Sequence, residues 1–490
     1  MNAENTLMTE ALDEKADGVV TVETTEEDAA LDKRILRKID GVVLTLVTIV
    51  ATLEFLDKNG MAYAAVFGMR QDTGLVGQEY SWLGSIFYFG YLGALIPCLW
   101  LVNVVHTGMF VGVATTCWGI VILSMAACNN FAGLATVRFL LGVFEAGILP
   151  AFMIIQSKWW KREEQALRTA LWYNTFAGIF GGILSYAIGH IQGNLATWRY
   201  IFLIYGAVTV FVGILVTIML PDRPGTAWFL TAREKERAQE RLAGNQQGAD
   251  SKNFNPRHCL EAITQPQYWV VILFVIAQSI TNAGITNFNP LIIAGFGYDQ
   301  QTTTLMATPQ AAVALVGQII FSFIALYVPN IRCLLWMIAC LPALVGAILI
   351  NTLDPVTQRA GALTGVYLMG FYNVPWVLCL SLVTSNTSGT TKKAFASVSV
   401  AVAYAVGNVV GPQLFLANQA PFYKLGLYAM MVCFAIMFLC GGAYWAIAYS
   451  ENKRRDRLYG VPNLDRQTVV ETAFNTGDTD KVNKDYRYSY

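Results

Sequence analysis

Charged side chains fall inside two segments of the chain that are otherwise apolar. Glu54, Asp57 and Lys58 lie in the first of these segments, and Arg138 and Glu145 lie in a later one. A charge in an apolar segment of membrane-spanning length is costly, and it normally faces a water-filled cavity or an opposite charge. These residue types therefore indicate a buried site that handles charge.

The spacing of these charges predicts two helix faces. Glu54 and Lys58 are four residues apart, with the acid N-terminal to the base, which is the favourable order for a helical ion pair. Arg138 and Glu145 are separated by about two helical turns and so share a face. Gly142 lies between them and permits close approach of another helix or a ligand.

Two interpretations of these charges differ in what the site does. In the first, Lys58 and Arg138 bind a carboxylate, and Glu145 or Asp57 loads and releases a proton. In the second, the charges neutralise one another and hold the two helices together. For Glu54 this second, structural interpretation is the stronger one.

Amide side chains take the place of charges in the second half of the chain. Asn282, Asn287, Asn373 and Asn408 are candidates to hydrogen-bond a polar substrate, although single amides often serve only to join helices. Helix breakers accompany them in NVPW (373–376) and GNVVGPQ (407–413), where freed backbone groups could line a cavity. We expect charge handling in the first half and neutral recognition in the second.

The elements that must position these residues are long apolar helices. Hydrophobic residues make up 55% of the chain and charged residues only 13%, well below the share in soluble proteins. Apolar runs of about twenty residues, the length that crosses a bilayer, recur along the chain. They predict an all-α, multi-pass membrane protein with spans at roughly 41–64, 81–102, 108–128, 131–155, 168–190, 200–220, 267–289, 304–327, 331–351, 360–383, 394–416 and 424–448.

Lys and Arg residues predict how these spans are oriented. They are frequent in the segments that share a side with the N-terminal residues, whereas the opposite loops hold only Arg70, Arg199, Arg359 and Lys424. By the positive-inside rule both termini are cytosolic. We expect a disordered tail (1–38), a six-helix bundle (39–220), a cytosolic linker (221–265), a second six-helix bundle (266–449) and a tail (450–490) that is also disordered. The charged stretch 231–242 predicts a short solvated or interfacial connector helix.

Other functional classes lack their signatures. No G-x-x-x-x-G-K-[ST] loop and no pairing of a nucleophile with histidine is present, so we expect neither an ATP-driven pump of that type nor an enzyme. The nine cysteines are scattered and form no metal-ligand spacing, and the basic residues form no nucleic-acid stripe. We expect no cofactor, metal or nucleic acid.

Several sequence blocks resemble the fungal allantoate permease family, the anion:cation symporters of the major facilitator superfamily. They are FLDKNGMAYAAVFGMRQD (55–72), YSWLGSIFYFGYL (80–92), RFLLGVFEAGILPAF (138–152), SKWWKREEQALRTALWY (157–173), WRYIFLIYG (198–206), NFNPLIIAGFGY (287–298) and NTSGTTKKAFASVSVAVAYAVGNVVGPQLF (386–415). The resemblance extends from about residue 35 to 450. It implies the major facilitator fold, with Lys58 at the family's cationic position and Arg138 and Glu145 on its Arg…Gly…Glu-Ala-Gly pattern.

One departure from the superfamily concerns the loop between the second and third spans. The superfamily has an acid and arginines there, whereas CLWLVNVVHTGMF (98–110) has only His106 as a titratable group, which we interpret as a solvated loop residue. A weaker copy, VPNIRCL (328–334), retains Arg332. Because these loops are thought to close the inner gate in the family, the departure leaves the strength of that gate open.

The resemblance implies a secondary transporter that takes up a small organic anion or carboxylate-bearing vitamin together with protons. The expected partners are this anion, protons and the lipid bilayer, for a monomer in the plasma membrane. The alternative is an efflux transporter that exports a fungal secondary metabolite. A non-transporting nutrient receptor would need long signalling tails, which the sequence does not show.

Overall fold

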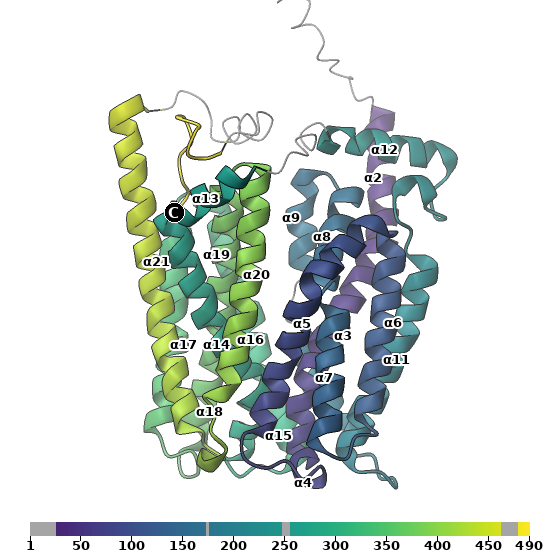
Figure 1. The fold of residues 1–490 in the computed structure, drawn as a ribbon, viewed down its shortest axis with the longest axis vertical. Helices are drawn as coiled ribbons and strands as arrows, with labels where there is room; N and C mark the ends of the chain where they lie inside the picture. The colour runs from purple at the N-terminus through teal and green to yellow at the C-terminus, as the bar shows by residue number, and fades with distance from the viewer. Residues whose placement is uncertain (1–25, 173–175, 247–254, 462–478) are drawn as a thin grey trace, which may run out of the picture.

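The computed structural model describes residues 26–172, 176–246, 255–461 and 479–490, and it consists of two helical bundles side by side (Figure 1). The first bundle contains α3 (Thr45–Val66), α5 (Glu79–Val104), α6 (Thr107–Met125), α7 (Phe131–Glu145), α8 (Ile148–Trp159), α9 (Arg162–Trp172), α10 (Phe176–Ile188) and α11 (Thr197–Met219). The second contains α14 (Pro266–Ala294), α15 (Gln300–Met306), α16 (Thr308–Tyr327), α17 (Arg332–Thr352), α18 (Arg359–Met369), α19 (Asn373–Asn386), α20 (Thr390–Gln413) and α21 (Lys424–Tyr459). The predicted all-α class is confirmed for the described residues.

Eleven helices or helix pairs in the described residues are long and apolar enough to cross a membrane. A shorter apolar helix, Ala177–Ile188, occupies the position of the fifth predicted span. That span, predicted at 168–190, is divided between α9 and α10, and residues 173–175 lie outside the described part of the chain. The first span is longer than predicted, because α2 (Glu26–Ile39) continues through one π-helical turn (Asp40–Leu44) into α3.

Proline residues explain where two spans are interrupted. Proline has no N–H group, so Pro150 leaves the carbonyl of residue 146 without its helical donor, and the fourth span divides there into α7 and α8. Pro375 has the same effect on residue 371, within the 3-10 turn Gly370–Tyr372 that joins α18 to α19. The break predicted in NVPW is therefore present, whereas α20 continues through the second predicted breaker to Gln413.

Glycines bring the backbones of α5 and α7 into contact. A Cβ atom on Gly142 would collide with the carbonyl oxygen of Phe87, and one on Gly90 would collide with that of Phe139. The predicted close approach at Gly142 is thus to a neighbouring helix. It fixes the distance between α5 and α7, and α7 carries Arg138 and Glu145.

The two ends of the molecule differ in how the bundles meet. We call the end with α12 (Ala232–Gln246) and α13 (Pro256–Thr264) the linker end, and the opposite end with α4 (Met69–Asp72) and α15 the far end (Figure 1). In the far half, Tyr80 donates to the carbonyl of Asn287 (2.8 Å) and Ser85 donates to that of Val409 (2.7 Å). Arg70 also donates to the Tyr423 hydroxyl (3.1 Å). These bonds join the two bundles, and we call them the far-end seal.

The linker helix α12 packs on the first bundle. Glu234 is 3% exposed and accepts from Lys38 at 2.7 Å, and Arg237 pairs with Asp32 of α2 at 3.0 Å. Arg241 pairs with Glu164 of α9. Three charges of the predicted connector therefore form ion pairs that fasten it to the first bundle, whereas Arg233, Glu236 and Glu240 are exposed.

Ordered structure extends into both predicted tails. Helix α2 begins at Glu26, and α21 continues to Tyr459. Residues 479–490 pack against the linker end of the second bundle, with Asp480 and Tyr486 buried. These parts of the tails are helical or packed against the bundle, and residues 1–25 and 462–478, to which the expectation of disorder also applies, lie outside the described part of the chain.

Candidate functional site

Lys58 lies between two carboxylates from different helices. Its ammonium group is 2.5 Å from Glu54 Oε1, one turn earlier on α3, and 3.3 Å from Glu145 Oε2 on α7. Glu145 is fully buried, whereas the side chains of Lys58 and Glu54 are 22% and 18% exposed. The contact between Lys58 and Glu145 therefore brings together the two helix faces that the spacing predicted.

Aromatic side chains connect this charge cluster to the second bundle. The Lys58 ammonium lies 5.8 Å from the centre of the Phe87 ring on α5. The next residue, Tyr88, makes an edge contact with Tyr404 of α20, with ring centres 6.0 Å apart. The two halves of the candidate site thus meet across the boundary between the bundles.

Asn282 is the centre of a polar network in the second bundle. Its amide nitrogen donates to Asn408 Oδ1 (3.0 Å) and to the Tyr404 hydroxyl (3.3 Å), and its oxygen accepts from the Tyr372 hydroxyl (3.0 Å). The Trp376 ring lies 5.7 Å from that of Tyr404. Two of the predicted amides therefore come together, and Tyr404 connects them to Tyr88 of the first bundle.

Asp57 points away from Lys58, although the two residues are adjacent. Successive residues on a helix are rotated by about 100°, and this rotation directs Asp57 into the first bundle. One carboxylate oxygen, Oδ2, accepts from Trp118 Nε1 (2.6 Å) and Thr209 Oγ1 (3.4 Å). The other, Oδ1, is buried without a hydrogen-bond partner.

Arg138 lies two turns before Glu145, and it is 3% exposed. Its Nη2 atom is 2.9 Å from the sulfur of Met61, and its Nε is buried without a partner. Among the described residues, Arg138 forms no ion pair with a carboxylate. It is therefore a buried cation in the first bundle, separate from the Lys58 pair.

The remaining predicted amides lie apart from the Asn282 network. Asn287 is buried at the far-end seal, where its side chain donates to the carbonyl of Ala283 (2.8 Å) and its own carbonyl accepts from Tyr80. Asn373 is half-buried at the first residue of α19. Its neighbour Tyr372, and not Asn373, donates to Asn282.

Sequence reasoning missed the aromatic members of the site. Tyr88, Tyr372, Tyr404 and Trp118 carry no charge, and in apolar segments they are not distinguishable by type from packing residues. One signal was available for Tyr404, because it lies one helical turn before Asn408 and so shares its face. No comparable spacing identified the other three.

At the linker end, Asp222 places a carboxylate against the loop between the second and third spans (98–110), which has no acidic residue of its own. It follows α11 and accepts from Lys158 Nζ (2.9 Å) and from the backbone N–H of Thr107 (2.8 Å). Partial burial alone would raise the pKa of Asp222, but these two hydrogen bonds outweigh it and hold the pKa below its ordinary value. His106, in the loop itself, is exposed and lies 3.7 Å from Asp222.

Two helical bundles with charged and amide side chains at the boundary between them are typical of a secondary transporter. The chain matches the family model of the Major Facilitator Superfamily over residues 47–412, and it belongs to this superfamily. It is 32% identical to the allantoate permease of Saccharomyces cerevisiae, over 96% of this chain and 88% of the permease. It is 37% identical to an uncharacterized transporter of Schizosaccharomyces pombe, over 94% of this chain and 87% of that transporter.

Solved structures share the fold. A bacterial homologue of the human lysosomal transporter Spinster, in an inward-facing and unoccupied conformation, superposes with a TM-score of 0.59 and 15% identity. The match covers 83% of this chain and 96% of that structure. A D-xylose–proton symporter gives a TM-score of 0.60 at 13% identity, over 82% of this chain and 97% of that structure.

Proposed function

We propose that this protein is a proton-coupled symporter that takes up a small organic anion across the plasma membrane, with its linker end in the cytosol. The observation that carries the proposal is the position of Lys58 between Glu54 and Glu145, where the rings of Phe87 and Tyr88 connect it to Tyr404 and the amides of the second bundle. The similarity to allantoate permease supports a carboxylate as the transported group. The basic residues at the linker end support its cytosolic orientation.

Competition for Lys58 would couple the anion to a proton. While Glu145 is ionised it pairs with Lys58, so a substrate carboxylate must displace it. Protonation of Glu145 removes that competitor, and one N–H of the ammonium group, which keeps its contact with Glu54, becomes available to the substrate as a charge-assisted hydrogen-bond donor. One proton and one carboxylate therefore occupy the site together, which is the condition for symport.

The amide network would bind the rest of the substrate. Asn282, Asn408 and the two tyrosine hydroxyls offer donors and acceptors at one place, and they bond to one another in the described geometry. A polar substrate can replace these bonds without leaving a buried polar group unsatisfied. Recognition by such groups favours a small, polar carboxylate over an apolar one.

Uptake assays with two variants test this mechanism. We expect Lys58→Ala to lower uptake of labelled allantoate, or of another carboxylate that the wild type accumulates, by more than about tenfold, because a charged hydrogen bond contributes about 1.5–3 kcal/mol. Glu145→Gln mimics the protonated acid, so it should retain exchange of labelled for unlabelled substrate and lose uphill accumulation. Lys424→Ala, an exposed lysine at the far end, is the control.

Two results would contradict the proposal. Wild-type uptake by Lys58→Ala would remove the lysine from the anion site. Accumulation by Glu145→Gln that still collapses when an ionophore dissipates the proton gradient would assign coupling to another acid, of which Asp57 is the next candidate. Retention of labelled substrate in cells that lack the protein would instead indicate efflux.

A further inference from the structure

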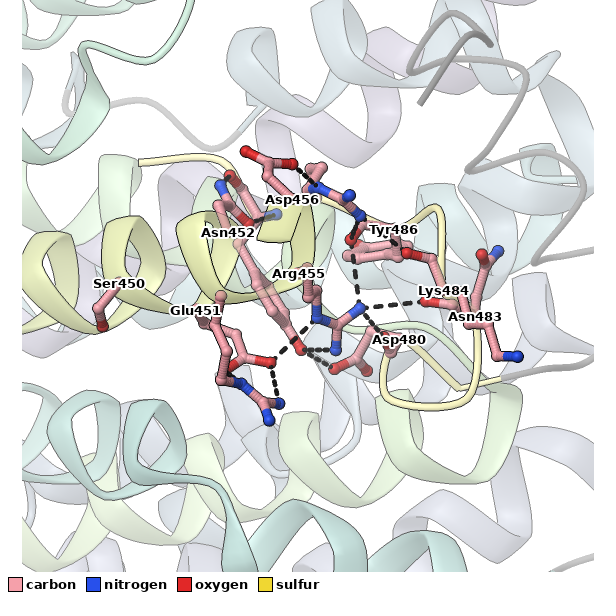
Figure 2. Close-up of polar contacts among 12 residues, drawn as sticks. Ser450, Glu451, Asn452, Arg455, Asp456, Asp480, Asn483, Lys484 and Tyr486 are labelled. Carbon is pink, nitrogen blue, oxygen red and sulfur yellow. Dashed lines mark hydrogen bonds and ion pairs between the residues drawn. The ribbon is translucent and has the colours of Figure 1, made fainter. Parts of the chain in front are cut away.

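Residues 479–490 pack against the linker end of the second bundle, beside the last turns of α21 (Figure 2), and we call the polar surface that they cover the recess. Thr479, Asp480, Tyr486, Tyr488 and Ser489 are all buried. The segment contacts α13, Gln265 at the start of α14, α20, α21 and the end of α19. Three kinds of contact hold it, and each uses a different chemical group.

The first contact is a buried charge cluster. The Asp480 carboxylate, fully buried, accepts from Lys392 (2.6 Å), from the Tyr488 hydroxyl (2.8 Å) and from Gln265 (2.9 Å). Lys392 is only 1% exposed and its other carboxylate partner is Glu261. Removal of one partner from a buried lysine strongly destabilises the folded state, so Asp480 is needed to keep this charge cluster stable.

The second contact is a guanidinium surrounded by backbone carbonyls. Arg455 of α21 donates from Nη1 to the carbonyls of Asp480 (2.9 Å), Asn483 (3.1 Å) and Tyr486 (3.2 Å), as Figure 2 shows. Glu451, one turn earlier, pairs with the same guanidinium at 3.0 Å. These bonds require the segment to turn around Arg455, so they select its conformation.

The third contact consists of two asparagine side chains that pair with the backbone as a strand would. Asn386 donates to the carbonyl of Ser489 (2.8 Å) and accepts from its N–H (2.7 Å). Asn452 makes the same two bonds to Tyr488, both at 2.8 Å. Recognition of main-chain groups together with pockets for side chains is how proteins bind extended peptides.

We propose that the linker end of the second bundle is a peptide-binding site and that residues 479–490 are its ligand, held in cis. Because the segment belongs to the same chain, its binding is intramolecular and a high effective concentration favours it. Its partners Gln265 and Lys392 lie at the linker ends of α14 and α20, which carry Asn282 and Asn408. The bound segment is a clasp that holds the linker ends of these helices to α21.

Hydrogen exchange on the purified full-length protein tests the clasp. In the unsubstituted chain, the backbone amides of Tyr488 and Ser489 should exchange at least about tenfold more slowly than in an unstructured peptide, because opening must precede exchange. Asp480→Asn should bring these amides close to the unstructured rate and also accelerate exchange around Lys392. Asp485→Asn makes the same chemical change five residues away at an exposed side chain, and it should leave every rate unchanged.

A synthetic peptide of residues 479–490 tests whether the recess is a binding site. The Asp480→Asn protein should bind the labelled peptide, whereas the unsubstituted protein, whose recess is occupied, should bind it at least about tenfold more weakly. A peptide with Asp480→Asn should not bind. Exchange in α17 shows whether each variant is folded, and Asn452→Ala gives a second way to loosen the segment without altering the charge cluster.

Unprotected amides at Tyr488 and Ser489 in the unsubstituted chain would overturn the proposal. So would equal exchange rates in the Asp480→Asn and unsubstituted proteins. If a folded Asp480→Asn protein does not bind the peptide, the linker end is not a peptide-binding site and the segment is only packed against the bundle. None of these measurements involves a transported substrate, so they are independent of the proposed symport.

Discussion

At the scale of single residues, the properties of the site depend on which group each charged side chain contacts. The Lys58 ammonium group pairs with both Glu54 and Glu145. In contrast, Asp57 accepts a hydrogen bond from Trp118, and Arg138 contacts the sulfur of Met61. Glu54 is thus a partner of Lys58 from within the same helix, and Glu145 is the partner from another helix. A movement of α3 relative to α7 therefore changes the distance between Lys58 and Glu145 but not the spacing of Lys58 and Glu54 along α3.

The residue-scale prediction concerns Asn408. Its Oδ1 accepts from Asn282 while its own amide donates to the carbonyl of Tyr404 (2.8 Å). Asn408→Ala leaves Asn282 with one acceptor fewer, a change of about 1 kcal/mol, so we expect KM for substrate to rise roughly five- to tenfold while maximal uptake changes less. Initial rates of uptake across a range of substrate concentrations measure this.

Asn351→Ala is the matched control for that measurement. Its amide makes the same bond to the carbonyl four residues earlier, Ala347, at 2.8 Å, but it lies near the end of α17 and away from the site. An unchanged KM in Asn408→Ala, or an equal rise in both variants, would remove Asn408 from substrate recognition.

At the scale of elements, close helix packing decides where the buried charges lie. Gly90 and Gly142 allow α5 and α7 to touch through their backbones, which sets the position of Glu145 relative to Lys58. Helix α7 ends at Glu145, shortly before Pro150, so this acid lies at the break within the fourth span. Asp222 links the ends of α6, α8 and α11 in a similar way at the linker end.

The element-scale prediction is that Gly142 tolerates no side chain. A Cβ at this position would collide with the backbone of α5, and relief requires α7 to move. We expect Gly142→Ala to lower the free energy of unfolding by about 1–3 kcal/mol, the usual cost of overpacking, and to reduce uptake. Thermal unfolding of the purified protein in detergent measures the first effect.

Gly93→Ala on α5 provides the comparison, because a Cβ there meets no atom within 4 Å. We expect this variant to be neutral or slightly stabilised, since alanine is a better helix former than glycine. Equal melting temperatures for Gly142→Ala and the wild type would show that α5 and α7 can separate at no cost.

At the scale of the whole molecule, the bundles are joined at the far end. Hydrogen bonds from Arg70, Tyr80 and Ser85 reach the second bundle there, and α10 packs against α15 and α16. Alternating access moves one bundle against the other around a central site. The far-end contacts must therefore break in each cycle, whereas contacts within a bundle persist.

A disulfide across the far end should stop transport. The position of a Cβ on Gly182 of α10 lies 3.3 Å from the Cβ of Thr308 on α16, close to the 3.5–4.5 Å that a disulfide spans. We expect the pair Gly182→Cys and Thr308→Cys to lose uptake on mild oxidation, by at least about tenfold, and to recover it with a reductant. Uptake before and after oxidation, with gel analysis of the cross-link after proteolysis, measures this.

A cross-link inside one bundle controls for the chemistry. Gly365 and Leu349 belong to α18 and α17 of the second bundle, and their Cβ positions are 3.2 Å apart. A Cβ on Gly365 also comes within 2.8 Å of the Gly346 carbonyl oxygen, so uptake is compared with the reduced form of the same variant, and cross-linking should not lower it further. Full transport by the oxidised Gly182–Thr308 pair would mean that the bundles do not separate at the far end.

The sequence by itself determined the helical membrane fold, the superfamily and the Glu54–Lys58 pair. Each of these depends on local properties, namely the length of apolar runs, sequence blocks and a spacing of one helical turn. The sequence also identified Asn282 and Asn408 as candidates, because amides are conspicuous in apolar helices.

Only the tertiary structure decided which distant groups meet. Helices that are apolar on most faces do not reveal which face meets which neighbour, so the turn of Asp57 toward Trp118 and the position of Asn287 in the far-end seal were not predictable. The same reason applies to residues 479–490, whose polar composition is typical of a disordered tail. Their order comes from Lys392, Arg455, Asn386 and Asn452, which approach one another only when the second bundle has folded.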